Sequence, residues 1–199
     1  MKLKICGMKD PTNILEVSQL LPDYMGFIFY EKSKRYFNGV LPKMPQSIKK
    51  VGVFVDENYE NITTKIKKYS LDLLQLHGNE SPELCLRLQK HKLQIIKVFS
   101  VDDDFNFDEL KQYELACDYF LFDTKGKLHG GNGETFNWSI LKKYKSQKPL
   151  ILSGGIGLTE IEQIKKLEIS LFAIDINSKF EIEPGLKNTE LLKQIKLLN

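Results

Sequence analysis

The segment PLILSGGIG, residues 149–157, joins an apolar run to a glycine-rich turn, and residues 159–167 follow it with helical character. The apolar run Leu150, Ile151 and Leu152 has no alternating polar residues, a pattern typical of a strand buried on both faces of a parallel sheet. We therefore interpret this part of the chain as one strand–turn–helix unit.

The same kind of apolar run recurs along the whole sequence. Eight runs begin at intervals of 21 to 31 residues, near Lys2, Tyr24, Val51, Asp72, Gln94, Asp118, Pro149 and Leu171. Eight strands with helical segments between them predict a closed (β/α)8 TIM barrel of the α/β class, because an open doubly wound sheet usually has fewer strands. At 199 residues the barrel is compact, since about 250 residues are typical. We expect residues 1–199 to form one domain.

The segments between the apolar runs differ in how clearly they predict helices. Asp10 and Ser81 each precede a proline, and a capping side chain followed by proline is a helix start. Thr159 is a candidate cap for the helix of the seventh unit. Residues 41–45 and 107–113, in the second and fifth units, permit only short elements.

The composition favours one soluble globular domain with a substantial core. Of the 199 residues, 42% are hydrophobic, and the formal net charge of +3 is too small to predict nucleic acid binding. The cysteines Cys6, Cys85 and Cys117 are odd in number and include no Cys-x-x-Cys pair, which argues against disulfides and a zinc site. Because no run has the length of a signal peptide or a membrane span, we expect a cytoplasmic protein without membrane contact.

Polar and glycine residues gather just after five of the eight strands, where the active face of this fold lies. They are Cys6-Gly7, His77-Gly78, Asp123-Thr124, Ser153-Gly154-Gly155 and Asp175-Ile176-Asn177-Ser178. Gly154 and Gly155 allow backbone N–H groups to approach a phosphate at the start of a helix. A purely structural turn explains two glycines about as well, but the loop after the seventh strand is a recurrent phosphate site of this fold.

Cys6 and Asp123 are the strongest catalytic candidates, and each also has a plainer explanation. A free cysteine is usually a small buried apolar side chain, whereas Cys6 ends a strand beside Gly7. Lys4, on the same strand face, would lower the pKa of the thiol if it lies nearby. Asp123 follows an apolar run, which predicts a raised pKa and an acid role, or else a cap for the next loop.

Asp175 and His77 leave similar alternatives open. Asp175 follows the eighth strand as Asp123 follows the sixth, but Asn177 and Ser178 are candidate partners that would occupy its carboxylate. His77 is either a site residue or a hydrogen-bonded structural histidine. His91 has no comparable position at a strand end.

Six motifs spread along the chain complete the pattern: KICGM (4–8), GFIFY with SKRY (26–30 and 33–36), LQLHG (74–78), FDT (122–124), GGNG through FNW (130–138) and LSGGI (152–156). Together they resemble the phosphoribosylanthranilate isomerases of tryptophan biosynthesis, and the resemblance covers essentially the whole sequence. The KICG start, combined with LQLHG and the glycine-rich loop before FNW, is highly specific.

The resemblance implies an isomerase of the aldose–ketose type, an intramolecular oxidoreductase that works without cofactor or metal. The reaction is an Amadori rearrangement of N-(5-phosphoribosyl)anthranilate to 1-(2-carboxyphenylamino)-1-deoxyribulose 5-phosphate. An acid must protonate the ribose ring oxygen, so that the ring opens to an iminium ion, and a base must remove the proton from the adjacent carbon. By resemblance, Cys6 is the base and Asp123 is the acid.

The resemblance also implies the substrate-binding residues. Arg35 would bind the anthranilate carboxylate, for which a guanidinium offers a two-pronged match, with a surface ion pair as the plainer alternative. Asp175 would approach the anthranilate amine, His77 would shape the sugar site, and residues 130–133 would form a mobile lid. The phosphate would be held by backbone groups around Gly154, Gly155, Asn177 and Ser178.

Two residues after the eighth strand depart from the family pattern D-V-S-S-G-V-E, since Asn177 replaces a Ser and Lys179 replaces a Gly. If that glycine has a positive φ, Lys179 would strain the loop; alternatively, its charge would assist phosphate binding. The rival interpretations are another sugar-phosphate isomerase and a noncatalytic barrel that binds a phosphorylated ligand. The presence of both Cys6 and Asp123 disfavours the noncatalytic barrel. We expect a monomer or a homodimer.

Overall fold

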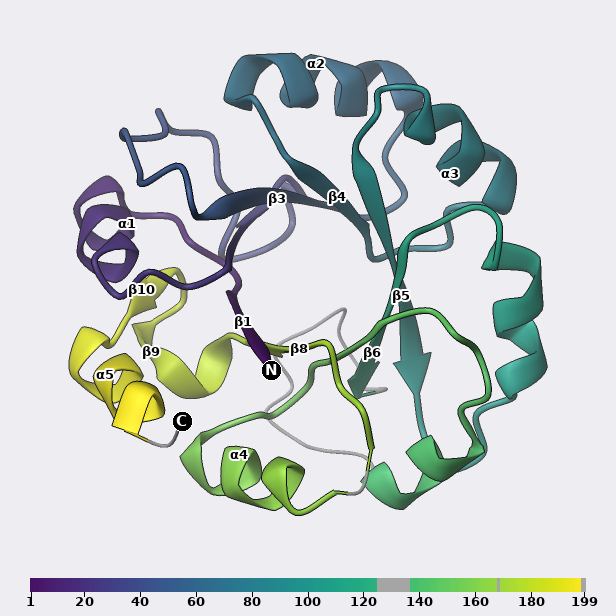
Figure 1. Cartoon of the computed structure of the whole chain (residues 1–199). Helices are drawn as coiled ribbons and strands as arrows, with labels where there is room; N and C mark the ends of the chain where they lie inside the picture. Colours follow the sequence, from purple (N-terminus) through teal and green to yellow (C-terminus); the bar gives the residue numbers. More distant parts are fainter. Residues whose placement is uncertain (125–136, 168, 198–199) are drawn as a thin grey trace.

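The computed structural model describes residues 1–124, 137–167 and 169–197, and its centre is a closed barrel of eight parallel strands (Figure 1). The strands are β1 Lys2–Ile5, β2 Tyr24–Ile28, β3 Lys49–Phe54, β4 Leu73–Leu76, β5 Gln94–Val101, β6 Tyr119–Thr124, β7 Leu150–Leu152 and β8 Ala173–Ile176. Each strand pairs with the next along the chain, and β8 pairs with β1 to close the barrel. The predicted (β/α)8 barrel is confirmed.

Helices form a ring outside the strands (Figure 1). In the described part of the chain they are α1 Pro11–Ser18, α2 Tyr59–Tyr69, α3 Pro82–Gln89, η1 Phe107–Tyr113, η2 Trp138–Lys143, α4 Leu158–Lys165 and α5 Thr189–Leu197, of which η1 and η2 are 3-10 helices. Asp10 and Ser81 cap α1 and α3 as predicted. The prediction for Thr159 is wrong, because Gly157 precedes α4 and its N–H donates to the carboxylate of Glu160 at 2.8 Å.

The connection after β2 contains no helix among residues 29–48, all of which the structure describes. Pro42 and Pro45 explain this, because each removes a backbone donor and clashes with a preceding helical turn. The connection is fixed instead by Phe37, which is fully buried and whose N–H donates to the carbonyl of Ile28 at 2.8 Å. This connection carries Arg35 to the rim of the barrel.

A small hairpin that the sequence does not predict lies between β8 and α5. It consists of η3 Ser178–Phe180, a 3-10 turn, followed by the antiparallel strands β9 Glu181–Glu183 and β10 Leu186–Lys187. Glu181 and Lys187 are register partners across the hairpin. The fold thus places two opposite charges side by side next to the end of β8.

Side chains alternate between the inside and the outside of the barrel, and this alternation creates the site. Toward the amino ends of the strands, the interior of the barrel is apolar. It is filled by Tyr24, Val51, Leu73, Ile96, Val98, Tyr119, Leu121, Ile151 and Ala173. Two residues beyond members of this layer, Gln75, Asp123 and Asp175 take the same inward direction on β4, β6 and β8. A polar layer therefore covers the apolar one at the carboxyl ends of the strands.

Candidate active site

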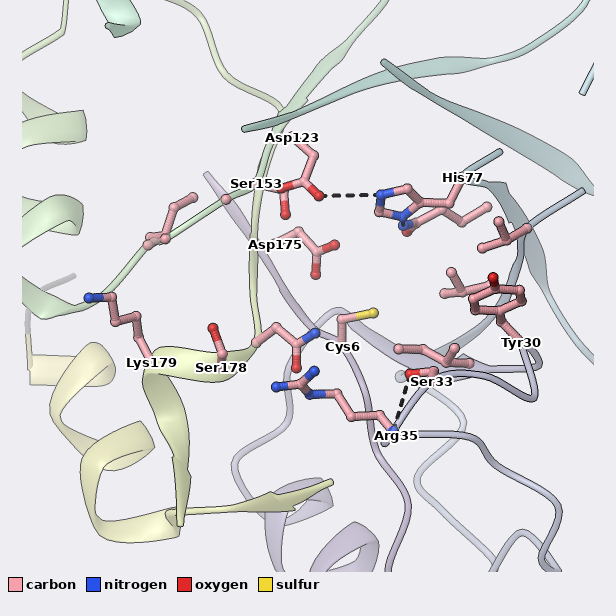
Figure 2. Close-up of a pocket in the computed structure, with 18 residues that line it drawn as sticks. Cys6, Tyr30, Ser33, Arg35, His77, Asp123, Ser153, Asp175, Ser178 and Lys179 are labelled. Carbon is pink, nitrogen blue, oxygen red and sulfur yellow. Dashed lines mark hydrogen bonds and ion pairs between the residues drawn. The ribbon is translucent and has the colours of Figure 1, made fainter. Parts of the chain in front are cut away.

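A pocket lies above this polar layer (Figure 2). Its lining comes from the ends of the strands and the segments that follow them, on both sides of the closure between β1 and β8. All nine residues predicted for the site line this one pocket: Cys6, Arg35, His77, Asp123, Gly154, Gly155, Asp175, Asn177 and Ser178. The sequence therefore locates the pocket, while the role of each residue stays a prediction.

Cys6 lies at the end of β1 against Gly26 of β2. A Cβ on Gly26 would lie 2.7 Å from the Cys6 sulfur and 3.1 Å from the Lys4 nitrogen, so the glycine leaves the space in which thiol and ammonium meet. Burial raises the pKa of the Cys6 thiol; Lys4 lowers it, Asp175 raises it, and Lys187 lowers it. Lys4 thus favours the thiolate, as expected, but burial outweighs it and the net pKa is raised.

Asp175 is held by Lys4 and not by Asn177 or Ser178, the partners that the sequence suggests. Lys4 Nζ donates to Asp175 Oδ2 at 2.7 Å, and the two side chains are 0% and 4% exposed. Burial raises the pKa of the Asp175 carboxyl although Lys4 opposes the rise. Asp175 Oδ1 has no hydrogen-bond partner among the described residues, and Figure 2 shows this carboxylate between Asp123 and Cys6. This oxygen is a buried acceptor without a partner in the described part of the chain, on a residue that lines the pocket.

His77 is linked to Asp123. Its Nε2 lies 3.3 Å from Asp123 Oδ2, the contact that Figure 2 marks, and its Nδ1 lies 3.2 Å from the amide nitrogen of Gln75. An amide nitrogen only donates, so Nδ1 accepts and the ring hydrogen lies on Nε2, the nitrogen nearer to Asp123. Of the two interpretations of His77, the structure places it in the pocket beside the predicted acid.

The loop after β7 has the backbone shape that its glycines predict. Gly154 and Gly155 have φ of +91° and +61°, in the left-handed region that favours glycine. A Cβ on Gly154 would overlap Thr124, so any larger residue is excluded there. The loop leads directly into the N-terminus of α4, where backbone N–H groups and the helix dipole favour an anion.

Lys179 does not strain the loop after β8, so that concern from the family comparison is removed. It lies in η3 and is not among the described residues with a positive φ. Its Cβ is 3.6 Å from the position of a Cβ on Gly157, which brings Lys179 close to the end of the glycine-rich loop. The other departure, Asn177, accepts a hydrogen bond from Lys187 Nζ on its Oδ1 at 2.7 Å.

Three residues that the sequence does not single out hold the site in place: Gln75, Glu181 and Lys187. Gln75 lies two positions before His77, so strand alternation alone would have placed it on the same face. Glu181 forms an ion pair with Arg35. The Arg35 side chain is 15% exposed and the Glu181 side chain is 4% exposed. Arg35 therefore does form an ion pair, as the plainer alternative proposed, but the pair is largely buried and does not lie on the surface.

The proposed lid, residues 130–133, lies outside the described residues. Within the described ranges, no group of three or more His, Cys, Asp or Glu side chains is arranged to hold a metal ion. Among the same residues, no helix combines the length and the apolar character needed to cross a membrane.

The fold and the pocket together define an enzyme of the (β/α)8-barrel class, with a thiol, a carboxyl group and a glycine-rich loop around one cavity. The sequence model of N-(5'-phosphoribosyl)anthranilate isomerase matches residues 3–196. The chain belongs to this isomerase family.

Individual relatives support the assignment. The chain is 47% identical over 200 residues to the N-(5'-phosphoribosyl)anthranilate isomerase of Parabacteroides distasonis, an alignment that covers 97% of this chain and 90% of the relative. A phosphoribosylanthranilate isomerase in complex with reduced 1-(o-carboxyphenylamino)-1-deoxyribulose 5-phosphate has a TM-score of 0.82 and 30% identity, with 97% and 95% of the two chains covered. A structure of monomers generated from the dimeric Thermotoga maritima enzyme has a TM-score of 0.79 and 28% identity, with 98% and 96% covered.

Proposed function

We propose that this chain catalyses the reaction for which its relatives are named, the isomerisation of N-(5'-phosphoribosyl)anthranilate in tryptophan biosynthesis, with Cys6 as general base and Asp123 as general acid. The observation that carries the proposal is the placement of a thiol and a carboxyl group across one pocket, with Asp175 between them (Figure 2). Ring opening and proton removal occur at neighbouring atoms of one sugar, so the reaction needs an acid and a base on opposite sides of it.

The steps follow from this placement. Protonated Asp123 gives its proton to the ribose ring oxygen as the C1–O bond breaks, and the nitrogen lone pair forms the C1=N bond of an iminium ion. The Cys6 thiolate then takes the proton from C2; the C–H electron pair becomes the C1=C2 bond, and the C=N electrons return to nitrogen. The enolamine loses its 2-hydroxyl proton and gains a proton on C1, which gives the ketone. The substrate nitrogen thus donates its lone pair in the first step and is the electron sink when C2 loses its proton.

The other pocket residues suit the remaining parts of this substrate. Arg35 offers N–H groups to the anthranilate carboxylate, and the Asp175 carboxylate offers an acceptor to the amine. His77 lies beside the acid and the sugar. The phosphate fits the loop with Gly154, Gly155, Asn177 and Ser178, with the Lys179 charge nearby. We propose that the enzyme is one cytoplasmic domain, acting as a monomer or a homodimer, and that it needs no cofactor.

The test is the loss of the substrate's own fluorescence after mixing with purified protein. We expect rapid loss with the wild type, and kcat lowered by about 10²–10⁴ in Cys6→Ser and in Asp123→Asn, the range typical of general acid–base groups. Cys85→Ser is the matched control, because Cys85 is also buried but lies outside the pocket. Loss no faster than spontaneous hydrolysis would refute the activity, and full activity in either site variant would refute that residue's role.

A further inference from the structure

The Arg35 guanidinium already has a carboxylate on one of its edges. Arg35 Nε lies 2.9 and 3.0 Å from the two carboxylate oxygens of Glu181, and Arg35 Nη2 lies 2.6 Å from Glu181 Oε2. A guanidinium has five N–H donors in a planar fork, and this contact uses the Nε edge and one hydrogen of Nη2. Within the described residues Nη1 has no hydrogen-bond partner. The edge formed by Nη1 and Nη2 therefore remains available for a second carboxylate.

Glu181 is itself held from two further directions. Lys187 Nζ donates to Glu181 Oε1 at 2.7 Å, and the backbone N–H of Gly185 donates to the same oxygen at 3.1 Å. The Lys187 side chain is fully buried and also donates to Asn177 at 2.7 Å. Burial raises the pKa of the Glu181 carboxyl, but Arg35 and Lys187 outweigh this and hold it below the usual value. The carboxylate is thus ionised and fixed on the hairpin.

The stem of Arg35 is confined as well. A Cβ on Gly7 would lie 2.6 Å from Arg35 Cδ and 2.7 Å from Asn177 Oδ1, so the arginine stem passes through space that Gly7 leaves open. Gly7 has a φ of +76°, which also favours glycine there. Arg35 lines the pocket, whereas Glu181 does not. Glu181 therefore acts on a ligand only through the arginine.

We propose that Glu181 is a positioning residue for substrate recognition: it holds Arg35 in the plane in which the Nη1–Nη2 edge meets the benzoate carboxylate of the substrate. This inference rests on the proposed function. An unrestrained arginine loses side-chain entropy when it binds a ligand, and the Glu181 contact removes much of that cost in advance. The three charges of Arg35, Glu181 and Lys187 sum to one positive charge, so the subsite still attracts an anion.

The experiment compares two ligands. One is reduced 1-(o-carboxyphenylamino)-1-deoxyribulose 5-phosphate, and the other is the same molecule without the ring carboxylate. We expect Glu181→Gln to weaken the binding of the carboxylated ligand by about tenfold, the loss of one charge-assisted contact, and to leave the other ligand unchanged. With the substrate, KM should rise about tenfold while kcat stays within about threefold. Glu183→Gln is the matched control, since Glu183 lies exposed on the same strand.

Other results would overturn the inference. If Glu181→Gln weakens the binding of both ligands equally, Glu181 only supports the fold or the phosphate loop. If it weakens the binding of neither ligand, Arg35 needs no partner to hold it. If Glu181→Gln does not fold, Glu181→Asp is used, because the ratio of the two affinities does not depend on overall stability. In an Arg35→Met background, Glu181→Gln should change neither affinity further. If the wild type binds neither ligand, the proposed function itself fails, which is a distinct outcome.

Discussion

Lys4 and Asp175 are register partners on β1 and β8, and their side chains form a buried ion pair of 2.7 Å where the barrel closes. Closure of the sheet alone brings the two residues together, although 171 positions separate them in the sequence. The pair borders Cys6, and its two charges act on the thiol in opposite directions: the ammonium favours the thiolate and the carboxylate disfavours it. Several measurable properties of the site depend on this balance.

Lys4→Met should make Cys6 less reactive. The substitution removes the cation that favours the thiolate, so the already raised pKa of Cys6 rises further. We expect alkylation of Cys6 by iodoacetamide at pH 8 to slow by about tenfold, since each pKa unit changes the thiolate fraction tenfold. Mass spectrometry of the Cys6 peptide measures the rate. Cys85 and Cys117, whose pKa values burial raises to about 11 and about 12, are internal controls that should stay unmodified.

The raised pKa of Cys6 also predicts the pH dependence of turnover. A general base acts only when deprotonated, so kcat/KM should still be rising at pH 9, the ordinary value for a thiol. The fluorescence assay, run from pH 6 to pH 9.5, checks this. A plateau reached near pH 7 would mean that the thiol is not the titrating base or that its pKa is not raised.

Gly26→Ala should reduce activity more than its effect on stability explains. Its methyl group would lie 2.7 Å from the Cys6 sulfur, so the thiol has to move. Gly52→Ala is the control, because its methyl group would lie 2.5 Å from Leu71, away from the pocket. Both should lower the free energy of unfolding by about 1–3 kcal/mol, the usual effect of overpacking. In urea unfolding and steady-state assays, only Gly26→Ala should lower kcat/KM of the folded protein.

Lys187 should make the folded state more stable at alkaline pH. Burial lowers the pKa of its ammonium from 10.5 to about 8, so between these values the unfolded chain binds a proton that the folded chain has released. Stability contributed by this group therefore increases as pH rises from 8 towards 10.5. We expect the free energy of unfolding of the wild type, relative to Lys187→Met, to rise by about 2 kcal/mol between pH 7 and pH 10. A difference that falls with pH would contradict the lowered pKa.

Lys97→Met should destabilise the protein strongly. Lys97 Nζ donates to the carbonyl of Gly78 at 2.7 Å and to the carboxylate of Glu80 at 3.1 Å, and the side chains of the ion pair are 3% and 1% exposed. Loss of Lys97 leaves the buried Glu80 carboxylate without its cation. We expect the free energy of unfolding, measured with urea, to fall by about 3–5 kcal/mol. Lys111→Met, at the exposed pair with Asp108, should change stability by about 0–1 kcal/mol. Similar losses of unfolding free energy in Lys97→Met and Lys111→Met would contradict the idea that burial makes the Lys97 pair matter more.

The sequence predicts the strands and the place of the pocket for one physical reason. Buried parallel strands are mostly apolar, so a polar residue that closes an apolar run indicates a nearby strand end, as at Asp123 and Asp175. The carboxyl ends of parallel strands meet at one edge, which brings these residues together. Helix caps at Asp10 and Ser81 are equally local signals, and both are confirmed.

The remaining features depend on interactions that no local pattern encodes. Arg35 and Glu181 are 146 positions apart, and only the completed fold places them in contact. The pKa of Cys6 reflects a competition between burial and Lys4, and its direction follows from packing density that a sequence does not state. The hairpin of β9 and β10 consists of strands of three and two residues, too short to produce a periodic pattern.

The closure between β1 and β8 also determines when the enzyme becomes active during its synthesis. Cys6 is synthesised before Asp175 and Glu181, and the pocket has no wall between them until β8 pairs with β1. A ribosome-bound chain that stops before β8 should thus contain Cys6 and Asp123, the proposed base and acid, but no complete pocket. If the chain is divided into two fragments between β7 and β8, each fragment alone should be inactive. Turnover should appear only when the fragments associate, so it reports that the barrel has closed.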